Sequence, residues 1–521
     1  MRPTRLFVPA ALAALLAGLV PGPARPARLF AQIIQIKTLP IADGDQWQIF
    51  PSANHALGGL SIALHDSLLD PFVNPAKGSR VSEGRRGLFF GSPTFYSLSK
   101  NAGGGRTFPL GGIVRSGATF GGLALAVQEI DTIRTSQQVF FPTEPLVFGG
   151  DGTPLPAPVT PPRRNEFAVA TLGRRFERAG LSVGVSALWS HLNAVDGVDM
   201  LYAGSRSIDQ HGGTLDLRLG ILKEFSRGRT LEGILLHDSF DMTHDVTWAD
   251  QVWDPNARTF TSRARLDRNR DRTDTWGMHL GASQPLGDAA WRIGAIVTGN
   301  LMSHPNLPNY QVAQVRSIPW DPGYTTAFDL GIGVAKVEGA TTFGAEAILE
   351  PIRTHTWGDA TDSIVTPSGT IPVGGRTTEN WFRFANAILR VGAAEEVPLE
   401  TLNTTLKALR LEAGLALRSV AYTLDQTDHT TLTSRTQNVS WMEWTPTWGL
   451  VLRFTDLEVR YSGGVTTGTG RPGVESTPFP GIADSGVAFG GQNFIAPPGV
   501  STTLTGVAVT THRLSISVPI R

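Results

Sequence analysis

The stretch LRLEAGLALR, which runs from Leu409 to Arg418, alternates apolar side chains with charged or very small ones. Successive side chains of a β-strand point to opposite faces, so Leu411 and Glu412 fall on opposite sides. One face of this segment is a continuous apolar row, and the other face carries charge. This alternation predicts a β-strand that separates an apolar environment from a polar one.

The same alternation recurs from about Leu88 to the end of the chain, for example over residues 181–187, 215–221 and 328–334. Short turns and long polar connections mostly alternate between these runs, as they do in a transmembrane barrel. Runs such as residues 404–424 exceed the strands of about 5–6 residues that build a soluble sandwich, the main alternative. We therefore predict an all-β fold, a transmembrane antiparallel β-barrel. About fifteen runs, and the even strand number of bacterial barrels, favour about fourteen strands.

The N-terminus has the pattern of a secretory signal. A basic start is followed by an apolar run from Leu6 to Val20 and then by a region of small residues. The run is shorter than the roughly 20 apolar residues of a membrane-spanning helix. We expect residues 1–31 to be a signal peptide that is cleaved after Ala31, with Ala24 and Ala27 as alternative sites.

Composition excludes several classes of function. The chain has no cysteine, which excludes disulfides, thiolate metal sites and a lipoprotein anchor, and its formal net charge of zero argues against a nucleic-acid partner. No phosphate-binding loop, zinc-binding helix or serine-hydrolase elbow is present. We expect no enzyme activity, no metal ion and no cofactor. A phospholipase or protease barrel with its residues at the rim is the alternative enzyme hypothesis, but no motif supports it.

Charged residues lie opposite the apolar rows of several predicted strands. A charge in a membrane-spanning element is costly unless it faces water or a partner, so these residues are predicted to face the lumen. Because both signs occur, the simpler interpretation is a polar lumen held by ion pairs, and the sharper one is a wall selective for an anionic solute. The predicted lumen-facing residues are Asp216, Arg218, Asp329, Arg390, Arg410, Glu412, Arg418, Glu458, Arg460 and Arg513.

Between the signal and the barrel of residues 87–521 lies a segment, residues 32–86, that does not alternate cleanly. Its apolar side chains need a surface to pack against, and a barrel lumen would provide one. Asp66 and Asp70 could meet lumen arginines or cap local backbone donors. The segment also contains a short motif, formed by Gly59, Ala63, Asp66, Ser67, Asn74, Pro75 and Ala76. This motif resembles the opening of the FadL-like family of outer-membrane transporters and of related PorV-type barrels.

The resemblance implies a fourteen-stranded barrel whose N-terminal segment folds inward as a hatch. It implies a channel or transporter in the outer membrane of a Gram-negative-type envelope for hydrophobic or amphipathic, fatty-acid-like small molecules. Its expected partners are a hydrophobic ligand and outer-membrane lipid, and we expect a monomer. The family continues its motif with Gly-Leu, whereas this chain has Lys77-Gly78. Two alternatives stay open, a barrel that anchors surface or secreted proteins and a general porin.

Overall fold

The structure is a computed structural model of the whole chain. The predicted signal peptide and residues 32, 45 and 82–86 of the N-terminal segment lie outside the described residues. The model describes residues 33–44, 46–81, 87–100, 103–131, 163–198, 207–254, 256, 258–287, 290–304, 323–360, 363–399, 405–472, 495 and 504–520.

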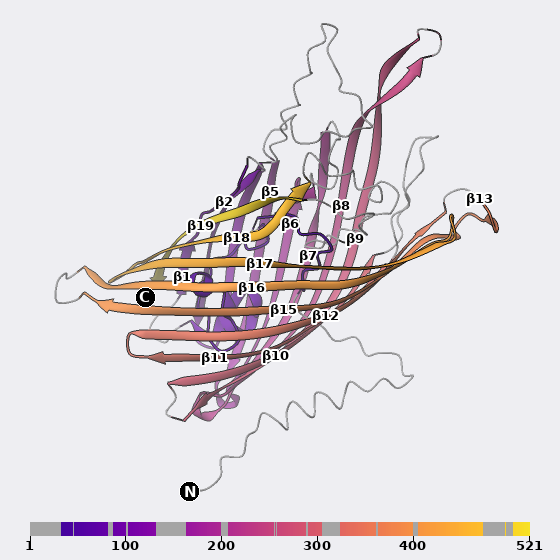
Figure 1. Cartoon of the computed structure of the whole chain (residues 1–521). Helices are drawn as coiled ribbons and strands as arrows, with labels where there is room; N and C mark the ends of the chain where they lie inside the picture. Colours follow the sequence, from indigo (N-terminus) through magenta and orange to yellow (C-terminus); the bar gives the residue numbers. More distant parts are fainter. Residues whose placement is uncertain are drawn as a thin grey trace, which may run out of the picture.

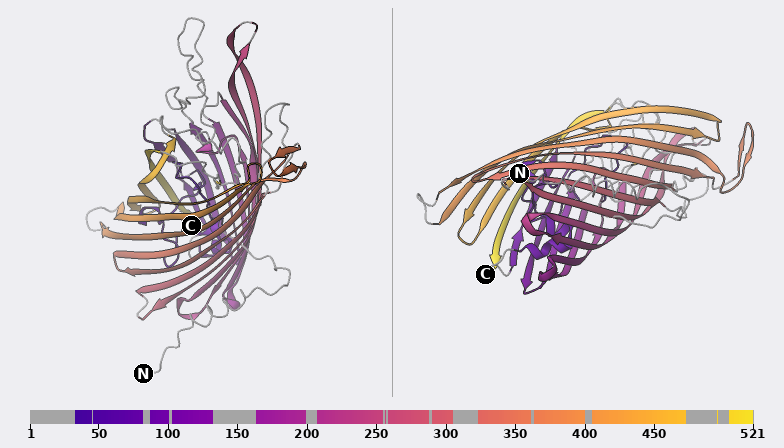
Figure 2. Two further views of the ribbon diagram at one scale, coloured as in Figure 1. Left: turned by 45° about the vertical axis from the view of Figure 1, so that its right-hand side comes forward. Right: turned by 90° about the horizontal axis from the view of Figure 1, so that it is seen from below.

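The wall is one antiparallel sheet that closes on itself (Figures 1 and 2). From β3 onward each wall strand pairs with the next one in the chain, and β1 and β2 both pair with β3 and with the last strand, β19. The wall strands are β1 (Gly87–Gly91), β2 (Thr94–Leu98), β3 (Gly104–Ser116), β4 (Thr119–Asp131), β5 (Arg163–Phe176), β6 (Leu181–Leu192), β7 (Ser207–Glu224), β8 (Thr230–Asp254), β9 (Thr259–Leu286), β10 (Trp291–His304), β11 (Gly323–Glu338), β12 (Thr341–Asp359), β15 (Arg376–Pro398), β16 (Leu406–Asp428), β17 (Thr433–Phe454), β18 (Glu458–Pro472) and β19 (Leu504–Ile520).

The barrel has sixteen strand positions, not the fourteen expected. Strands β1 and β2 share one position, because both pair with β3 on one side and β19 on the other in a single register that is interrupted at Ser92 and Pro93. Strand β3 accounts for a missed strand. It follows β2 after a short turn, and Pro109 with several glycines weakens its alternation, so the sequence pattern merged it with the preceding run.

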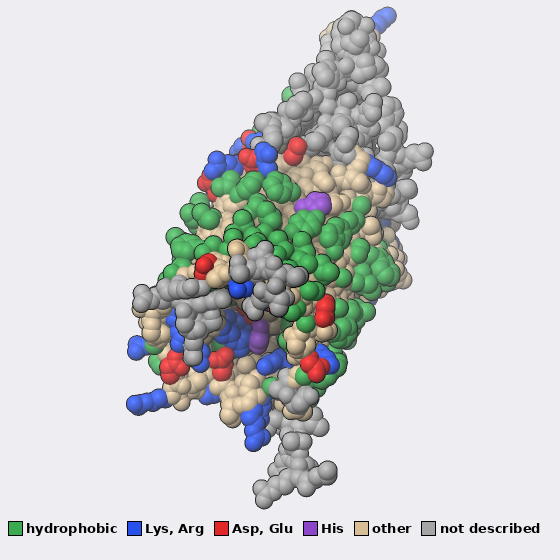
Figure 3. Space-filling model, turned by 90° about the vertical axis from the view of Figure 1, so that its left-hand side faces the viewer, with side chains coloured by type: hydrophobic (Ala, Val, Ile, Leu, Met, Phe, Trp, Pro, Cys, Tyr) green, Lys and Arg blue, Asp and Glu red, His purple; other side chains and the backbone are tan. Residues whose placement is uncertain are grey.

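The alternation predicted from the sequence sets the two faces of the wall. Leu217 and Leu219 on β7 are 44% and 39% exposed. Asp216, which precedes Leu217 and points to the other face, is 5% exposed. Large apolar side chains are exposed in this way from β1 to β19, and a space-filling view shows a broad hydrophobic band (Figure 3). A band of this size around a closed barrel fits a lipid environment, so the prediction of a membrane barrel is confirmed.

Short elements complete the fold. Before β1, the described chain forms three short helices, η1 (His55–Leu57), α2 (Asp70–Val73) and η2 (Pro75–Arg80). None of the helices in the described residues is long and apolar enough to cross a membrane. The remaining elements are η3 (Glu177–Ala179), η4 (Ser226–Gly228), β13 (Ile364–Thr366) and β14 (Gly369–Ile371).

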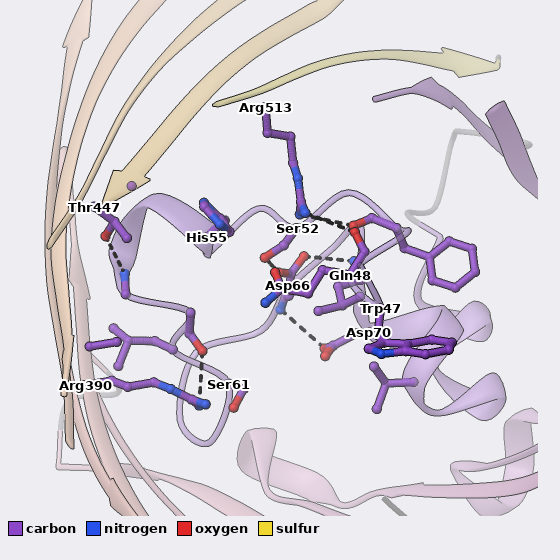
Figure 4. A pocket seen from close by; sticks show the side chains of 18 of the residues that line it. Trp47, Gln48, Ser52, His55, Ser61, Asp66, Asp70, Arg390, Thr447 and Arg513 are labelled. Carbon is purple, nitrogen blue, oxygen red and sulfur yellow. Dashed lines mark hydrogen bonds between the residues drawn. The ribbon is translucent and has the colours of Figure 1, made fainter. Parts of the chain in front are cut away.

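The described residues 33–44 and 46–81 lie inside the barrel, and residues 33–81 are called the inner segment below. The segment hydrogen-bonds to strands on different sides of the wall, for example to Asn300 on β10, Arg218 on β7 and Arg513 on β19. These partners are on the face opposite the exposed apolar side chains. Figure 4 shows part of the segment with wall strands curving around it. Its buried apolar side chains form clusters with those of the wall.

Candidate functional site

Arginine side chains of the wall donate hydrogen bonds to backbone carbonyls of the inner segment. Five of the arginines that were predicted to face the lumen donate such hydrogen bonds. Hydrogen bonds from a charged donor are stronger than those between neutral groups. Two of these contacts are drawn in Figure 4. The pairs are Arg218 with Val73 (3.2 Å), Arg390 with Gly59 (3.4 Å), Arg418 with Gln35 (2.7 Å), Arg460 with Ala53 (3.0 Å), and Arg513 with Gln48 and Phe50 (3.0 and 3.2 Å).

Acidic side chains stand beside most of these arginines. A buried charge needs a partner of opposite sign, so each ion pair lowers the penalty of placing the arginine in the wall. The arrangement fits the simpler interpretation, a polar lumen held by ion pairs. The pairs are Arg218–Asp216 (2.6 Å), Arg390–Glu346 (2.7 Å), Arg410–Glu412 (2.9 Å), Arg418–Glu350 (3.3 Å), Arg460–Glu412 (3.0 Å) and Arg460–Glu458 (3.0 Å).

Two predicted lumen residues have other surroundings. Asp329 on β11 has a buried carboxylate oxygen, Oδ1, without a hydrogen-bond partner among the described residues. Arg513 is 2% exposed, and its Nε donates to the Thr94 hydroxyl at 3.0 Å. The sequence pattern did not single out Glu346, yet its Oε2 accepts from the backbone amides of Ser61 and Ile62 at 2.9 Å each. No local signal marks such a residue, because its partners are nearly 300 positions away in the chain.

Glycines of the wall let the inner segment touch the strands directly. A Cβ on Gly414 would lie 2.2 Å from the backbone nitrogen of Gly58, and one on Gly392 would lie 2.5 Å from the carbonyl oxygen of Leu57. Real Cβ atoms do not approach this closely. Similar crowding is found at other wall glycines, against backbone atoms of the inner segment at Gly184 and Gly294 and against its side chains at the others, so the inner segment packs directly on strands that lack side chains there. These further positions are Gly184, Gly220, Gly294, Gly333, Gly344 and Gly449.

Asp66 organises the turns of the inner segment. Its carboxylate accepts hydrogen bonds from the Ser52 hydroxyl (2.5 Å) and from the backbone amides of Ala53, Asn54, Leu68 and Leu69. A carboxylate with several amide donors fixes the loops that supply them. Of the two roles considered for this residue, it performs the second, capping local backbone donors.

The Asn74-Pro75-Ala76 corner joins α2 to η2 and contacts the wall. The Asn74 side chain accepts from the Ala76 amide at 3.1 Å, which caps η2, and donates to Glu232 on β8 at 3.0 Å. Pro75 lies against Gly184 of β6, where a Cβ would be 2.7 Å from its carbonyl carbon. The corner therefore both turns the chain and fastens it to two strands.

The other motif residues are part of the same region. Gly59 has a φ of 75°, a left-handed conformation that favours glycine, and its carbonyl accepts from Arg390. Ala63 is buried at 6% exposure. Ser67 is exposed and lines a cavity at the end of the barrel that carries the short turns.

A buried ion triad connects the inner segment to the wall. Lys77 Nζ lies 3.3 Å from Asp70 and 3.0 Å from Glu232 of β8. Burial by itself would lower the pKa of Lys77, but the two carboxylates outweigh burial and raise it, so the lysine stays charged. Burial raises the pKa of Asp70 to about 6, with Asp66 and Glu232 adding to the rise and Lys77 opposing it. In the sequence analysis, Lys77 stands out only as a departure from the family motif.

Two cavities lie in the lumen beside the inner segment. The central cavity, of about 460 Å³, lies between the segment and the wall and is lined by residues such as Trp47, Arg390 and Arg513 (Figure 4). The lower cavity, of about 590 Å³, opens among β1, β19 and the turn between β17 and β18. Asp66, Asp70 and Lys77 line both cavities, so these three residues form the partition between them.

No protein-family model and no curated protein matches this sequence. Solved structures do match. The toluene transporter TodX of Pseudomonas putida is 10% identical with a TM-score of 0.39, over 93% of this chain and 99% of its own. The toluene transporter TbuX of Ralstonia pickettii is 9% identical with a TM-score of 0.39, over 92% and 100%. A FadL homologue of Pseudomonas aeruginosa is 12% identical with a TM-score of 0.41, over 90% and 99%.

Packing of the inner segment is expected to depend on pH through Asp70. Its pKa is about 6 when the segment is packed and about 4 in free peptide, so the packed state binds this proton more tightly. Packing is therefore favoured while Asp70 is protonated and loses stability as pH rises through the window from about 4 to 6. The difference between about pH 5 and pH 7.5 corresponds to roughly tenfold in the packing equilibrium.

Spin labels at Ser67→Cys and Arg178→Cys measure this dependence, since the chain has no other cysteine. We expect a single, narrow distance to be more populated at about pH 5 than at pH 7.5. Asp70→Asn should remove the dependence and keep the low-pH distribution. An identical pH response in Asp70→Asn would show that another group titrates.

Proposed function

We propose that the chain is a passive outer-membrane channel for hydrophobic or amphipathic, fatty-acid-like small molecules, in which the inner segment acts as a hatch. The observation that supports this most directly is the partition formed by Asp66, Asp70 and Lys77, which separates a cavity inside the barrel from one at its short-turn end. A solute that crosses the barrel has to pass this partition. The hatch hypothesis therefore requires movement of these residues.

The lining of the central cavity suits an amphipathic solute. Aromatic and aliphatic side chains form much of it, and a few charged groups stand among them, the usual composition of a site for an apolar ligand with a polar end. Arg390 and Arg513 are the wall cations in this lining. The larger apolar residues that line the cavity are Trp47, Ile49, Phe50, Leu60, Leu69, Val73, Ile234 and Ile296.

A general porin is less consistent with this lumen. Barrels of 16–18 strands leave an aqueous channel when nothing fills them. Here the inner segment occupies the lumen and is fastened by arginines, glycine contacts and the Asp70–Lys77–Glu232 triad. The triad is the contact most suited to a latch, because it is polar and can be exchanged for water contacts when the segment moves.

Replacing Lys77 tests the latch. Lys77→Gln leaves Asp70 and Glu232 facing each other without a cation, and breaking a buried pair in this way costs about 3–5 kcal/mol. Since each 1.4 kcal/mol corresponds to a factor of about ten, we expect vesicles with this variant to take up a fluorescent fatty-acid probe at least about a hundredfold faster than vesicles with the unaltered barrel. The matched control is Lys223→Gln, a change at a lysine that lies over the Phe225 ring.

The unaltered barrel must also take up the probe faster than empty vesicles and bind it in detergent. If it does neither, and Lys77→Gln changes nothing, the channel function is wrong. If uptake is present but is insensitive to Lys77→Gln, the channel remains and this latch is wrong.

A further inference from the structure

A third cavity lies at the short-turn end of the barrel and has a strong excess of positive charge. This rim cavity, of about 390 Å³, lies where the inner segment ends and the turn between β7 and β8 begins. Charged side chains gather on the end of the molecule shown in Figure 3, below the hydrophobic band. The charged residues considered below are Arg80, Arg115, Arg175, Arg229, Arg292 and Glu224.

Two carboxylates balance only part of this charge. Glu224 pairs with Arg80 at 3.1 Å and with Arg175 at 3.3 Å, and Glu177 pairs with Arg175 at 3.0 Å and with Arg115 at 2.8 Å. The shared carboxylates hold three guanidinium groups in place. Five arginines against two carboxylates leave a substantial positive excess among the described residues.

Two of the arginines have no acidic partner among the described residues. Arg292 donates to the Gly228 carbonyl at 3.1 Å and to the Ser283 hydroxyl at 2.9 Å, which fixes its position without neutralising it. Arg229 lies beside Gly228 and forms no ion pair within the described chain. The cavity therefore contains a fixed cation and a second, free one.

His65 at the edge of the cavity does not add to the charge. Partial burial and the nearby cations Arg80 and Lys77 lower the pKa of His65, whose side chain is 47% exposed, so its ring is neutral at physiological pH. The neutral ring lies 3.0 Å from Arg80 Nη1, where Nδ1 can accept from the guanidinium. This contact orients Arg80 toward the cavity.

We propose that the rim cavity binds a phosphate group, either as free phosphate or as the headgroup of a phospholipid. Planar guanidinium groups match the oxygen geometry of phosphate, and they hold it through paired hydrogen bonds. The charge excess fits a doubly charged oxyanion better than a singly charged carboxylate. Phe225, which is 48% exposed, lines the same cavity and provides an apolar surface on which the chains of a lipid could lie.

Binding at this position would connect the inner segment to the wall. Arg80 belongs to the inner segment, Arg115 to β3 and Arg292 to β10. A phosphate that contacts Arg80 together with the wall arginines would hold the end of the inner segment in place. The site is independent of the channel function proposed above, because it does not require any solute to pass the partition.

Calorimetric titration of the purified full-length mature chain in a nonionic detergent tests the site. The ligands are inorganic phosphate, short-chain dihexanoyl phosphatidic acid and acetate, at an ionic strength of about 10 mM so that screening is weak. The test variant is the double substitution Arg229→Gln/Arg292→Gln. The matched control is Arg174→Gln/Arg178→Gln, which removes two arginines on β5 and in the turn that follows it.

We expect phosphate or phosphatidic acid to bind to the unaltered chain and to lose at least tenfold in affinity in the test variant, with no loss in the control. Binding of inorganic phosphate supports a free oxyanion as ligand. Binding of phosphatidic acid alone supports a lipid headgroup. The proposal is overturned if neither ligand binds, if both variants lose affinity equally, or if acetate binds as tightly as phosphate.

Discussion

A barrel that lacks residues 33–81 is expected to conduct ions as an open pore, while the intact chain conducts little. The physical reason is the width of the barrel. Sixteen strand positions enclose more space than their own side chains fill, and barrels of this size are water-filled when empty. In the intact chain, the buried side chains of the inner segment, such as Leu57 and Ile36 with no measurable exposure, occupy that space.

Planar-bilayer recordings of the two proteins measure the effect. We expect the single-channel conductance of the shortened barrel to exceed that of the intact one by at least tenfold, since an aqueous channel replaces a filled lumen. Assembly of the shortened barrel is checked by resistance to dodecyl sulfate at room temperature and unfolding on heating. A folded barrel with unchanged low conductance would show that the inner segment does not block the lumen.

The faces of the wall could be predicted from the sequence because strand geometry is local. Within LRLEAGLALR, Leu411 is 53% exposed and Glu412 is 5% exposed, as the alternation predicts. The number of strands could not be predicted equally well. Strand β3 carries Pro109 and several glycines, so it lacks the continuous apolar row by which the other strands were found.

The contacts of the inner segment with the wall could not be predicted from local sequence patterns. Its contacts join residues that are far apart in the chain, as Ile34 and Asn300 are with a separation of 266 positions. The sequence indicated that an apolar segment with Asp66 needed a surface, but no periodicity identifies which wall residue each turn contacts. Glu232 illustrates this, because nothing around it in the sequence of β8 distinguishes it before Lys77 is placed beside it.

The role of the wall glycines was the feature that could least be predicted from the sequence. In the alternating pattern, Gly392 and Gly414 are only small residues on the polar face, where the lumen could equally hold serine or alanine. The structure gives a specific reason for glycine at both positions, the close approach of Leu57 and Gly58. Replacing either glycine by alanine adds one carbon atom that should displace the inner segment. The same change should not weaken the wall strands, because alanine forms β-strands at least as well as glycine does.

The double substitution Gly392→Ala/Gly414→Ala is expected to push η1 away from β15 and β16. The added Cβ atoms would lie 2.5 Å from Leu57 O and 2.2 Å from Gly58 N, where backbone has to move. Thr447 would then lose its hydrogen bonds to Ala56 O (2.9 Å) and from Gly58 N (3.1 Å). Leaving such buried backbone groups unpaired costs about 1–3 kcal/mol each.

Accessibility of a cysteine at position 57 reports the displacement. Leu57→Cys is expected to react slowly with a water-soluble maleimide in the otherwise unaltered barrel, because Leu57 has no exposed surface. In the Gly392→Ala/Gly414→Ala background we expect labelling about ten- to a hundredfold faster, from the loss of one to two such hydrogen bonds. Gly506→Ala is the matched control, since nothing lies within 4 Å of its added Cβ. Equal labelling in all three backgrounds would mean that the glycine contacts do not hold the inner segment, and the arginine contacts and the Asp70–Lys77–Glu232 triad would then have to fasten it to the wall.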